Sequence, residues 1–122
     1  MDIAAVASGD AEHYRWGEGC DGWHLLKRAD LSVIRERVPP GAAETRHRHA
    51  CARQFFYVLD GTAVIEVEGA HHVVAAGHGL HVPPGAAHRF RNDSAEDVHF
   101  IVVSAPTSRG DRETVEEIGT TS

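Results

Sequence analysis

Residues 41–61 read GAAETRHRHACARQFFYVLDG, a stretch that places two histidines ahead of a strand-like apolar run between two glycines. His47 and His49 are two residues apart, so their side chains project from the same face of an extended segment. Two imidazoles at this spacing can direct their nitrogen atoms at one point. Alone they are a weak signal, because the same spacing also arises by chance among surface histidines.

A second stretch, residues 77–92, reads GHGLHVPPGAAHRFRN. Pro83, Pro84 and Gly85 signal a tight corner just before the short segment that carries His88. Two such blocks, each with histidine on a strand, would let one β-barrel bring three imidazoles together in its interior. Imidazole nitrogens of this kind suit a divalent transition metal ion, namely zinc, iron, nickel, manganese or copper.

The rest of the chain has the pattern of an all-β protein. Glycine- and proline-rich turn signals recur at short intervals, and the runs between them are rich in valine, isoleucine, phenylalanine and tyrosine. This pattern is typical of a sandwich or barrel. Residues 62–68 alternate as a half-buried strand, with Glu66 on the solvent side and an inward face of Ala63, Ile65 and Val67. We predict helix only at residues 112–118, as a turn or two.

Composition excludes several classes of protein. The chain has 122 residues, 12 basic and 18 acidic, and a net charge of −6, which argues against binding of nucleic acid. No apolar run approaches the roughly 18 residues of a membrane-spanning helix. The acidic start, Met1-Asp2, does not resemble a secretory leader, so the cytoplasm is the expected compartment. The two cysteines, Cys20 and Cys51, are expected to be free thiols.

Both histidine-containing blocks resemble the two signature motifs of the cupin superfamily, whose members are double-stranded β-helix, jelly-roll-like barrels. The chain is similar to small single-domain bacterial cupins, which implies one domain over residues 1–122. Its parts would be N-terminal strands at about 13–30, a core barrel at about 31–105 and a tail at 106–122. The second block matches at every marker position, but the first has Gln54 where the family usually has glutamate. The resemblance implies one divalent metal ion, with the ligands His47, His49, Gln54 and His88.

Glutamine at position 54 would change the chemistry of such a site. Three neutral imidazoles and an amide oxygen leave a divalent metal its full +2 charge, which makes it a stronger electrophile than a site with a carboxylate ligand. The alternative is that Gln54 is a bystander at a three-histidine site. The cupins that open the ring of 4,5-unsaturated uronates are similar in their three-histidine, one-glutamine set. A sugar acid is nevertheless a doubtful substrate here, because the expected inward face of the last strand is largely apolar: Val98, Phe100, Val102 and Ser104.

Other polar residues are candidates for the pocket. Glu36 alternates with Arg35 and Arg37, so either the carboxyl group or the arginine pair reaches the cavity, or all three are surface charges. Cys51 either approaches the metal or is a rim thiol. Val102 and Ser104 are further pocket candidates. Five aromatic residues are either core or pocket wall: Trp16, Trp23, Phe56, Phe90 and Phe100.

The run at residues 55–59 is apolar on both faces and therefore needs cover outside the barrel. We predict that a second subunit covers it in a homodimer, with the N-terminal strands of the same chain as the alternative. The predicted function is redox-neutral Lewis-acid catalysis on a small molecule, of isomerase, ring-opening or lyase type. A metal-dependent dioxygenase and a non-catalytic metal-dependent binding or sensor protein are the alternatives, because a fold does not determine a function.

Overall fold

The computed structural model describes residues 1, 3–108 and 110–116. Within these residues nearly all regular structure is β-strand, which confirms the predicted all-β fold. The elements are η1 (Ser8–Asp10), β1 (Glu12–Trp16), β2 (Cys20–Lys27), β3 (Ser32–Val38), β4 (His47–His49), β5 (Arg53–Asp60), β6 (Thr62–Val67), β7 (Ala70–Ala75), β8 (Gly79–Val82), β9 (His88–Arg91), β10 (Val98–Ala105) and β11 (Arg112–Thr114).

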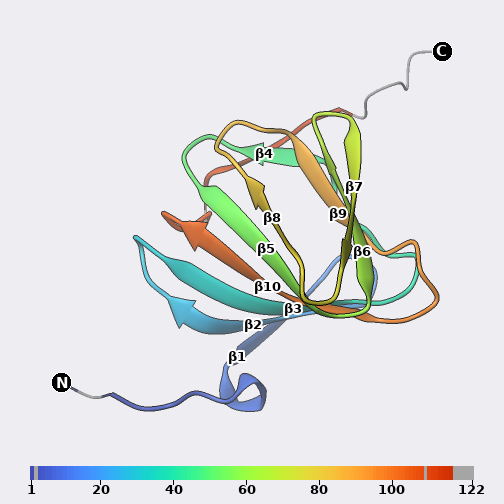
Figure 1. Ribbon diagram of the computed structural model, residues 1–122. Helices are drawn as coiled ribbons and strands as arrows, with labels where there is room; N and C mark the ends of the chain where they lie inside the picture. Colours follow the sequence, from blue (N-terminus) through green and yellow to red (C-terminus); the bar gives the residue numbers. More distant parts are fainter. Residues whose placement is uncertain (2, 109, 117–122) are drawn as a thin grey trace.

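The strands form two antiparallel sheets that face each other around a common interior (Figure 1). One sheet has six strands in the order β1-β2-β3-β10-β5-β8, and the other has five in the order β11-β4-β9-β6-β7. Strands distant in the chain are therefore neighbours, as when β3 and β5 flank β10. This topology brings β4 and β9, the two histidine-bearing strands, side by side.

The core is built from inward-facing residues of both sheets. Alternation along β10 buries its predicted inward face, Val98, Phe100, Val102 and Ser104. Phe90 and Phe100 stack with ring centroids 4.0 Å apart, and Phe56 lies about 6 Å from each of them. Each buried phenylalanine contributes roughly 1.5–3 kcal/mol to folding. Phe56 also packs edge-on against the ring of His88, so this aromatic cluster contacts the histidine site directly.

Two residues of the motifs, Gly61 and Asn92, shape the backbone around the core. Gly61 has a φ of +84°, and a Cβ atom there would lie 2.6 Å from the carbonyl oxygen of Asp97, so only glycine fits this turn. Asn92 is fully buried and donates hydrogen bonds to the carbonyl oxygens of Val38 and Glu96. Asn92 thereby ties the loop after β9 to β3.

The predicted C-terminal helical turn is wrong for the part of it that the structure describes. Residues Arg112–Thr114 form strand β11, which pairs antiparallel with β4; residues 117 and 118 lie outside the described chain. The reason is that a helix of one or two turns has little stability of its own, whereas β4 offers an edge with unpaired backbone groups. The tail therefore extends the second sheet.

Glu66 does not face solvent as the alternation of β6 predicts. It is only 5% exposed, and its carboxylate oxygen lies 3.3 Å from Nε of Arg46, which is equally buried. The same oxygen accepts a hydrogen bond from the backbone N–H of Gly69. A charged partner and a backbone donor together compensate the loss of water around this carboxylate.

One apolar surface remains open in the single chain. Phe55, Tyr57 and Leu59 on the outer face of β5 are 44%, 41% and 40% exposed. The N-terminal strands do not cover them, because β1 and β2 pair at the far edge of the sheet beyond β3.

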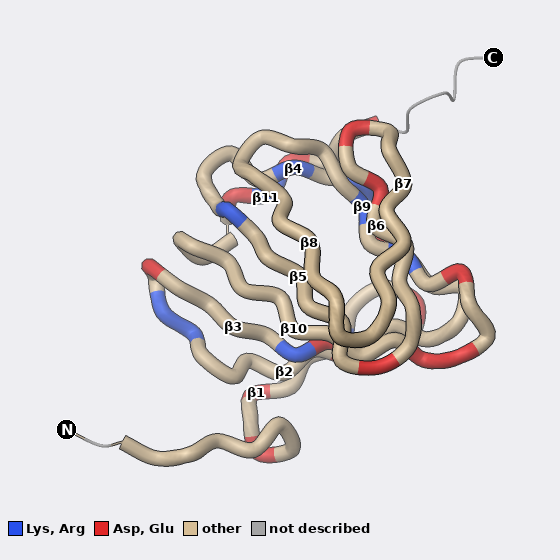
Figure 2. The backbone as a smooth tube through the Cα atoms, viewed as in Figure 1, with Lys and Arg blue, Asp and Glu red and all other residues tan. Residues whose placement is uncertain are grey.

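The basic residues form short, separated segments on the backbone (Figure 2). No helix in the described part of the chain has the length and apolar character needed to cross a membrane.

Candidate metal centre

Three histidines meet at one point inside the barrel. His47 and His49 project from β4, and His88 begins β9 directly opposite His47 in the ladder. All three are at most 5% exposed, and one ring nitrogen from each lies within 4.8 Å of the other two. Ligand nitrogens around one metal at roughly 2.1 Å lie about 3–3.4 Å apart, so small ring rotations would close the site.

Backbone carbonyl groups orient two of these rings. Nδ1 of His47 lies 2.7 Å from the carbonyl oxygen of Thr45, and Nδ1 of His88 lies 3.0 Å from that of Ala86. When Nδ1 donates its proton to a carbonyl, the lone pair of Nε2 is left for a metal. Nδ1 of His49 is buried with no hydrogen-bond partner among the described residues.

Burial keeps the three imidazoles neutral. It lowers the pKa of His47 and of His49 to about 4, and it also lowers the pKa of His88. A metal ion therefore has no protons to displace from these rings at neutral pH, which favours binding.

The side chain of Gln54 turns its amide oxygen toward this cluster. Its Nε2 group donates a hydrogen bond of 3.0 Å to Oγ of Ser104, which leaves Oε1 3.1 Å from Nε2 of His88. With the His88 proton on Nδ1, both of these facing atoms are acceptors. Two lone pairs at this distance repel each other unless a cation lies between them. The four residues thus fit a divalent metal ion by their chemistry as well as by their position.

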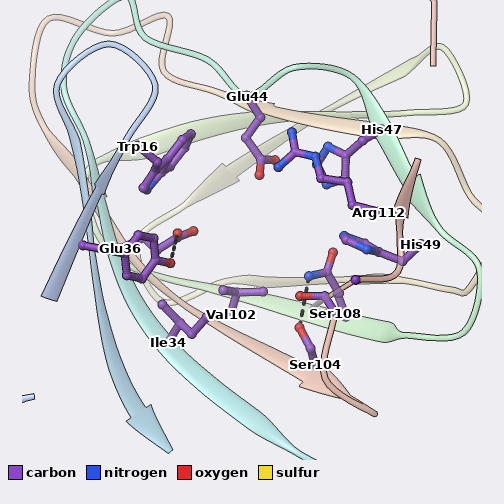
Figure 3. A pocket seen from close by; sticks show the side chains of 13 residues that line it. Trp16, Ile34, Glu36, Glu44, His47, His49, Val102, Ser104, Ser108 and Arg112 are labelled. Carbon is purple, nitrogen blue, oxygen red and sulfur yellow. Dashed lines mark hydrogen bonds between the residues drawn. The ribbon is translucent and has the colours of Figure 1, made fainter. Parts of the chain in front are cut away.

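A cavity of about 320 Å³ opens in front of the histidines (Figure 3). His47, His49 and Gln54 form one wall. The other walls come from β1, β3, β10 and the C-terminal segment and include both apolar and carboxyl-bearing side chains. This arrangement leaves room for a small molecule beside the metal position.

Two carboxyl groups face this cavity. Glu36 is 9% exposed, and Oε2 of Glu36 accepts a 2.7 Å hydrogen bond from the hydroxyl of Tyr14. Burial, followed by the negative charge of Glu44, raises the pKa of Glu36 to about 8. Burial also raises the pKa of Glu44, which accepts a hydrogen bond from the backbone N–H of Phe90. With a pKa of about 8, most Glu36 carboxyl groups carry a proton at pH 7 and a minor fraction are ionised.

Residues 34–104 match the family model of the cupin domain. The chain belongs to the cupin family. This assignment agrees with the resemblance of the two histidine-containing blocks to the cupin motifs and with the two-sheet barrel.

Three proteins illustrate what this cupin is similar to. It is 30% identical over 76 residues to the polyketide synthase CurC of Streptomyces cyaneus. This alignment covers 62% of this chain and 47% of CurC. The polyketide cyclase RemF of Streptomyces resistomycificus superposes with a TM-score of 0.82 at 19% identity, covering 95% of this chain and 87% of RemF. KdgF of Halomonas sp. gives 0.80 at 21% identity, covering 90% and 98%. The alignments to the first two curated relatives span about half of their length.

The structure separates the predicted pocket residues of this cupin into two groups. Glu36, Val102 and Ser104 line the cavity. Arg35 and Arg37 lie on the opposite face of β3, where Arg37 pairs with Asp21 at 2.7 Å. The remaining candidates do not line the cavity: Phe56, Phe90 and Phe100 are core residues, and Cys51 is exposed.

Several residues of the cavity were not predicted from the sequence. Ile34 lies two residues before Glu36 and therefore on the same face of β3, so alternation along the strand could have found it. Tyr14 reaches the cavity from β1, which pairs at the edge of the sheet and carries no motif. Trp16 on the same strand, which the sequence left as either core or pocket wall, also lines the cavity. The rest lie in the loop before β4 or in the C-terminal segment, namely Glu44, Ser108, Gly110 and Arg112.

The C-terminal segment is fixed to the turn between β4 and β5. The carboxylate of Asp111 accepts hydrogen bonds from the backbone N–H groups of Ala50, Cys51 and Ala52 at 2.8–3.2 Å. These bonds, that of Ala52 first, lower the pKa of Asp111. The neighbouring Arg112 is thereby held over the cavity, where its side chain points toward Glu44 (Figure 3).

Proposed function

We propose that this cupin is a metal-dependent enzyme that acts on a small carbonyl compound without net oxidation or reduction, as an isomerase, a ring-opening enzyme or a lyase. The observation that supports this proposal is the uncharged donor set of the site. Gln54 presents an amide oxygen where a carboxylate would lower the charge of the metal centre. His47, His49, Gln54 and His88 would hold one divalent ion of zinc, iron, nickel, manganese or copper.

The expected compartment of the protein is the cytoplasm.

When bound there, the metal would supply a Lewis acid that polarises a substrate carbonyl group. The chain itself contributes the remaining features of the site. Ser104 fixes the direction of the Gln54 amide, and the aromatic core beneath His88 keeps bulk water away from one side of the cluster. RemF is named as a polyketide cyclase, and ring closure of a polyketide is also carbonyl chemistry. That relationship supports the same class of reaction for this chain.

The test begins with the metal content of protein purified without chelators. We expect close to one transition-metal ion per chain and turnover of enolisable carbonyl compounds under strictly anaerobic conditions, followed by NMR. Reaction that consumes oxygen and stops when oxygen is removed would contradict the proposal and favour a dioxygenase. Close to one metal ion per chain, together with tight binding of a carbonyl compound that is not converted to product, would instead indicate a non-catalytic binding protein.

We also propose that the protein is a homodimer in which the exposed face of β5 contacts the second subunit. Phe55, Tyr57 and Leu59 lie on one face, and the ring of Phe55 fills the space beside Gly79 of β8, so the surface offered to a partner is apolar. Sedimentation equilibrium at micromolar concentration should give twice the 13.2 kDa of the chain. Leu59→Glu should shift the protein to monomer, whereas Val73→Ser, at an exposed valine on β7, should not. A wild-type protein that sediments as a monomer would refute the dimer.

A further inference from the structure

The cavity has a second polar centre apart from the histidines. Glu36 projects inward from the middle of β3, and the Tyr14 hydroxyl on β1 holds one of its carboxyl oxygens at 2.7 Å. No ion pair to Glu36 exists among the described residues. Figure 3 shows its carboxyl group across the cavity from the side chains of His47 and His49. Burying a charged carboxylate is costly unless a cation or several hydrogen-bond donors compensate it. A carboxyl group whose side-chain hydrogen-bond partner is one neutral hydroxyl is therefore unusual in a purely structural role.

The groups around Glu36 favour a carboxyl that gains and loses a proton near neutral pH. Tyr14 faces it from β1, the Cys20 thiol from β2, Glu44 from the loop before β4, and Arg112 from β11. The pKa of Glu36 is raised to about 8 by burial and by Glu44, with Tyr14 and Arg112 acting in the opposite direction. A proton donor or acceptor is most effective when its pKa lies close to the working pH.

The space between the two centres has an apolar side. Trp16, Ile34 and Val102 form this side, while polar side chains line the rest of the cavity, and the charged end of Arg112 points toward Glu44 (Figure 3). A polyol or a phosphorylated sugar would lose hydrogen bonds to water against the apolar side without replacing them there. A compact hydrocarbon body with one carbonyl group would lose few hydrogen bonds there.

We propose that Glu36 is the proton-transfer residue of this cavity and that the substrate is an enolisable carbonyl compound with an apolar body. The proposal rests on the function proposed above. Glu36 as carboxylate removes a proton from the carbon next to the carbonyl; the C–H bond breaks, its electron pair becomes the C=C bond of the enolate, and the π pair of the carbonyl moves onto its oxygen. In a substrate with a C=C bond beyond that carbon, the enolate is a dienolate. The proton held by Glu36 is then delivered to the far end of the dienolate, where a new C–H bond forms while the C=O bond is restored, and the C=C bond has moved into conjugation. Tyr14 limits the rotation of the carboxyl group throughout.

Deuterium exchange tests the assignment without the natural substrate. Zinc-loaded protein is incubated with acetophenone in D₂O, and incorporation at the methyl group is followed by NMR. We expect the wild type to accelerate exchange, Glu36→Gln to lower the rate by about 100-fold or more, and Glu36→Asp to restore part of it. Glu18→Gln, at an exposed position between β1 and β2, should behave as the wild type. Hydroxyacetone, a polar ketone, should be a poorer substrate than acetophenone by kcat/KM.

A second measurement does not depend on the metal. Infrared difference spectra of the metal-free protein at pH 7 should contain the carbonyl stretch of a protonated carboxyl group, and Glu36→Gln should lose it. Failure of the wild type to bind zinc, iron, nickel, manganese or copper would refute the proposed function but leave this band as the test of Glu36. With zinc bound, three results would each overturn the inference: equal exchange rates for wild type and Glu36→Gln, no exchange by the wild type, or preference for hydroxyacetone.

Discussion

Replacing His88 with alanine is expected to lower the affinity of the protein for zinc by more than about 100-fold, because changes to groups that merely orient a ligand already cost 10–100-fold. His88 faces the other three members of the candidate site. Its ring lies 4.4 Å from that of His47 and 5.8 Å from that of His49, and its Nε2 atom faces Oε1 of Gln54. Competition with a chromophoric chelator at pH 7 would measure the affinity, and elemental analysis would measure the metal retained on purification.

The control for this prediction is His72→Ala, since His72 is an exposed histidine on β7. Its zinc affinity should equal that of the wild type. Because His88 packs against Phe56, its removal also leaves a void, so thermal unfolding of each metal-free variant must be compared separately. Metal content that is unchanged in a folded His88→Ala protein would refute the three-histidine site.

Local patterns in the sequence predicted those parts of the fold that depend on neighbouring residues. The alternation of residues 98–104 identified the inward face of β10, because a strand with one face in the core must alternate. The spacing of His47 and His49, followed by His88 after a proline corner, predicted three imidazoles at one point. The structure brings their ring nitrogens together on two paired strands.

The predictions that failed depend on partners far away in the chain. The charge of Glu66 predicts exposure, but Arg46, twenty residues earlier, makes its burial possible. The segment from Arg112 has no strong strand pattern and becomes a strand because it meets the edge of β4. For the same reason the sequence did not reveal Arg112 or Tyr14 as cavity residues. Alternation placed Glu36 on one face of β3, but only the packed sheets show which face is interior.

Gln54→Glu is expected to change zinc affinity and turnover in opposite directions. A carboxylate reaches nearly as far as the amide, and the Ser104 hydroxyl, which now accepts from Gln54, can rotate to donate to it. The variant should therefore bind zinc as tightly as the wild type or more tightly, because a negative charge has been added beside the cation. Turnover should fall by about 10–100-fold, which corresponds to roughly 1–3 kcal/mol of lost transition-state stabilisation, because the metal centre is a weaker electrophile.

Gln54→Leu separates this effect from a loss of packing. Leucine has similar bulk and no oxygen atom, so we expect the barrel to remain folded while zinc affinity falls and deuterium exchange declines with it. Chelator competition would measure the affinity, and thermal unfolding of the metal-free proteins would show whether the fold is intact. The paired result, tighter binding with slower turnover for glutamate and weaker binding for leucine, is expected only if the amide oxygen of Gln54 contacts the metal. Zinc affinities equal to the wild type in both variants would show instead that the site consists of His47, His49 and His88 alone, with Gln54 as a bystander.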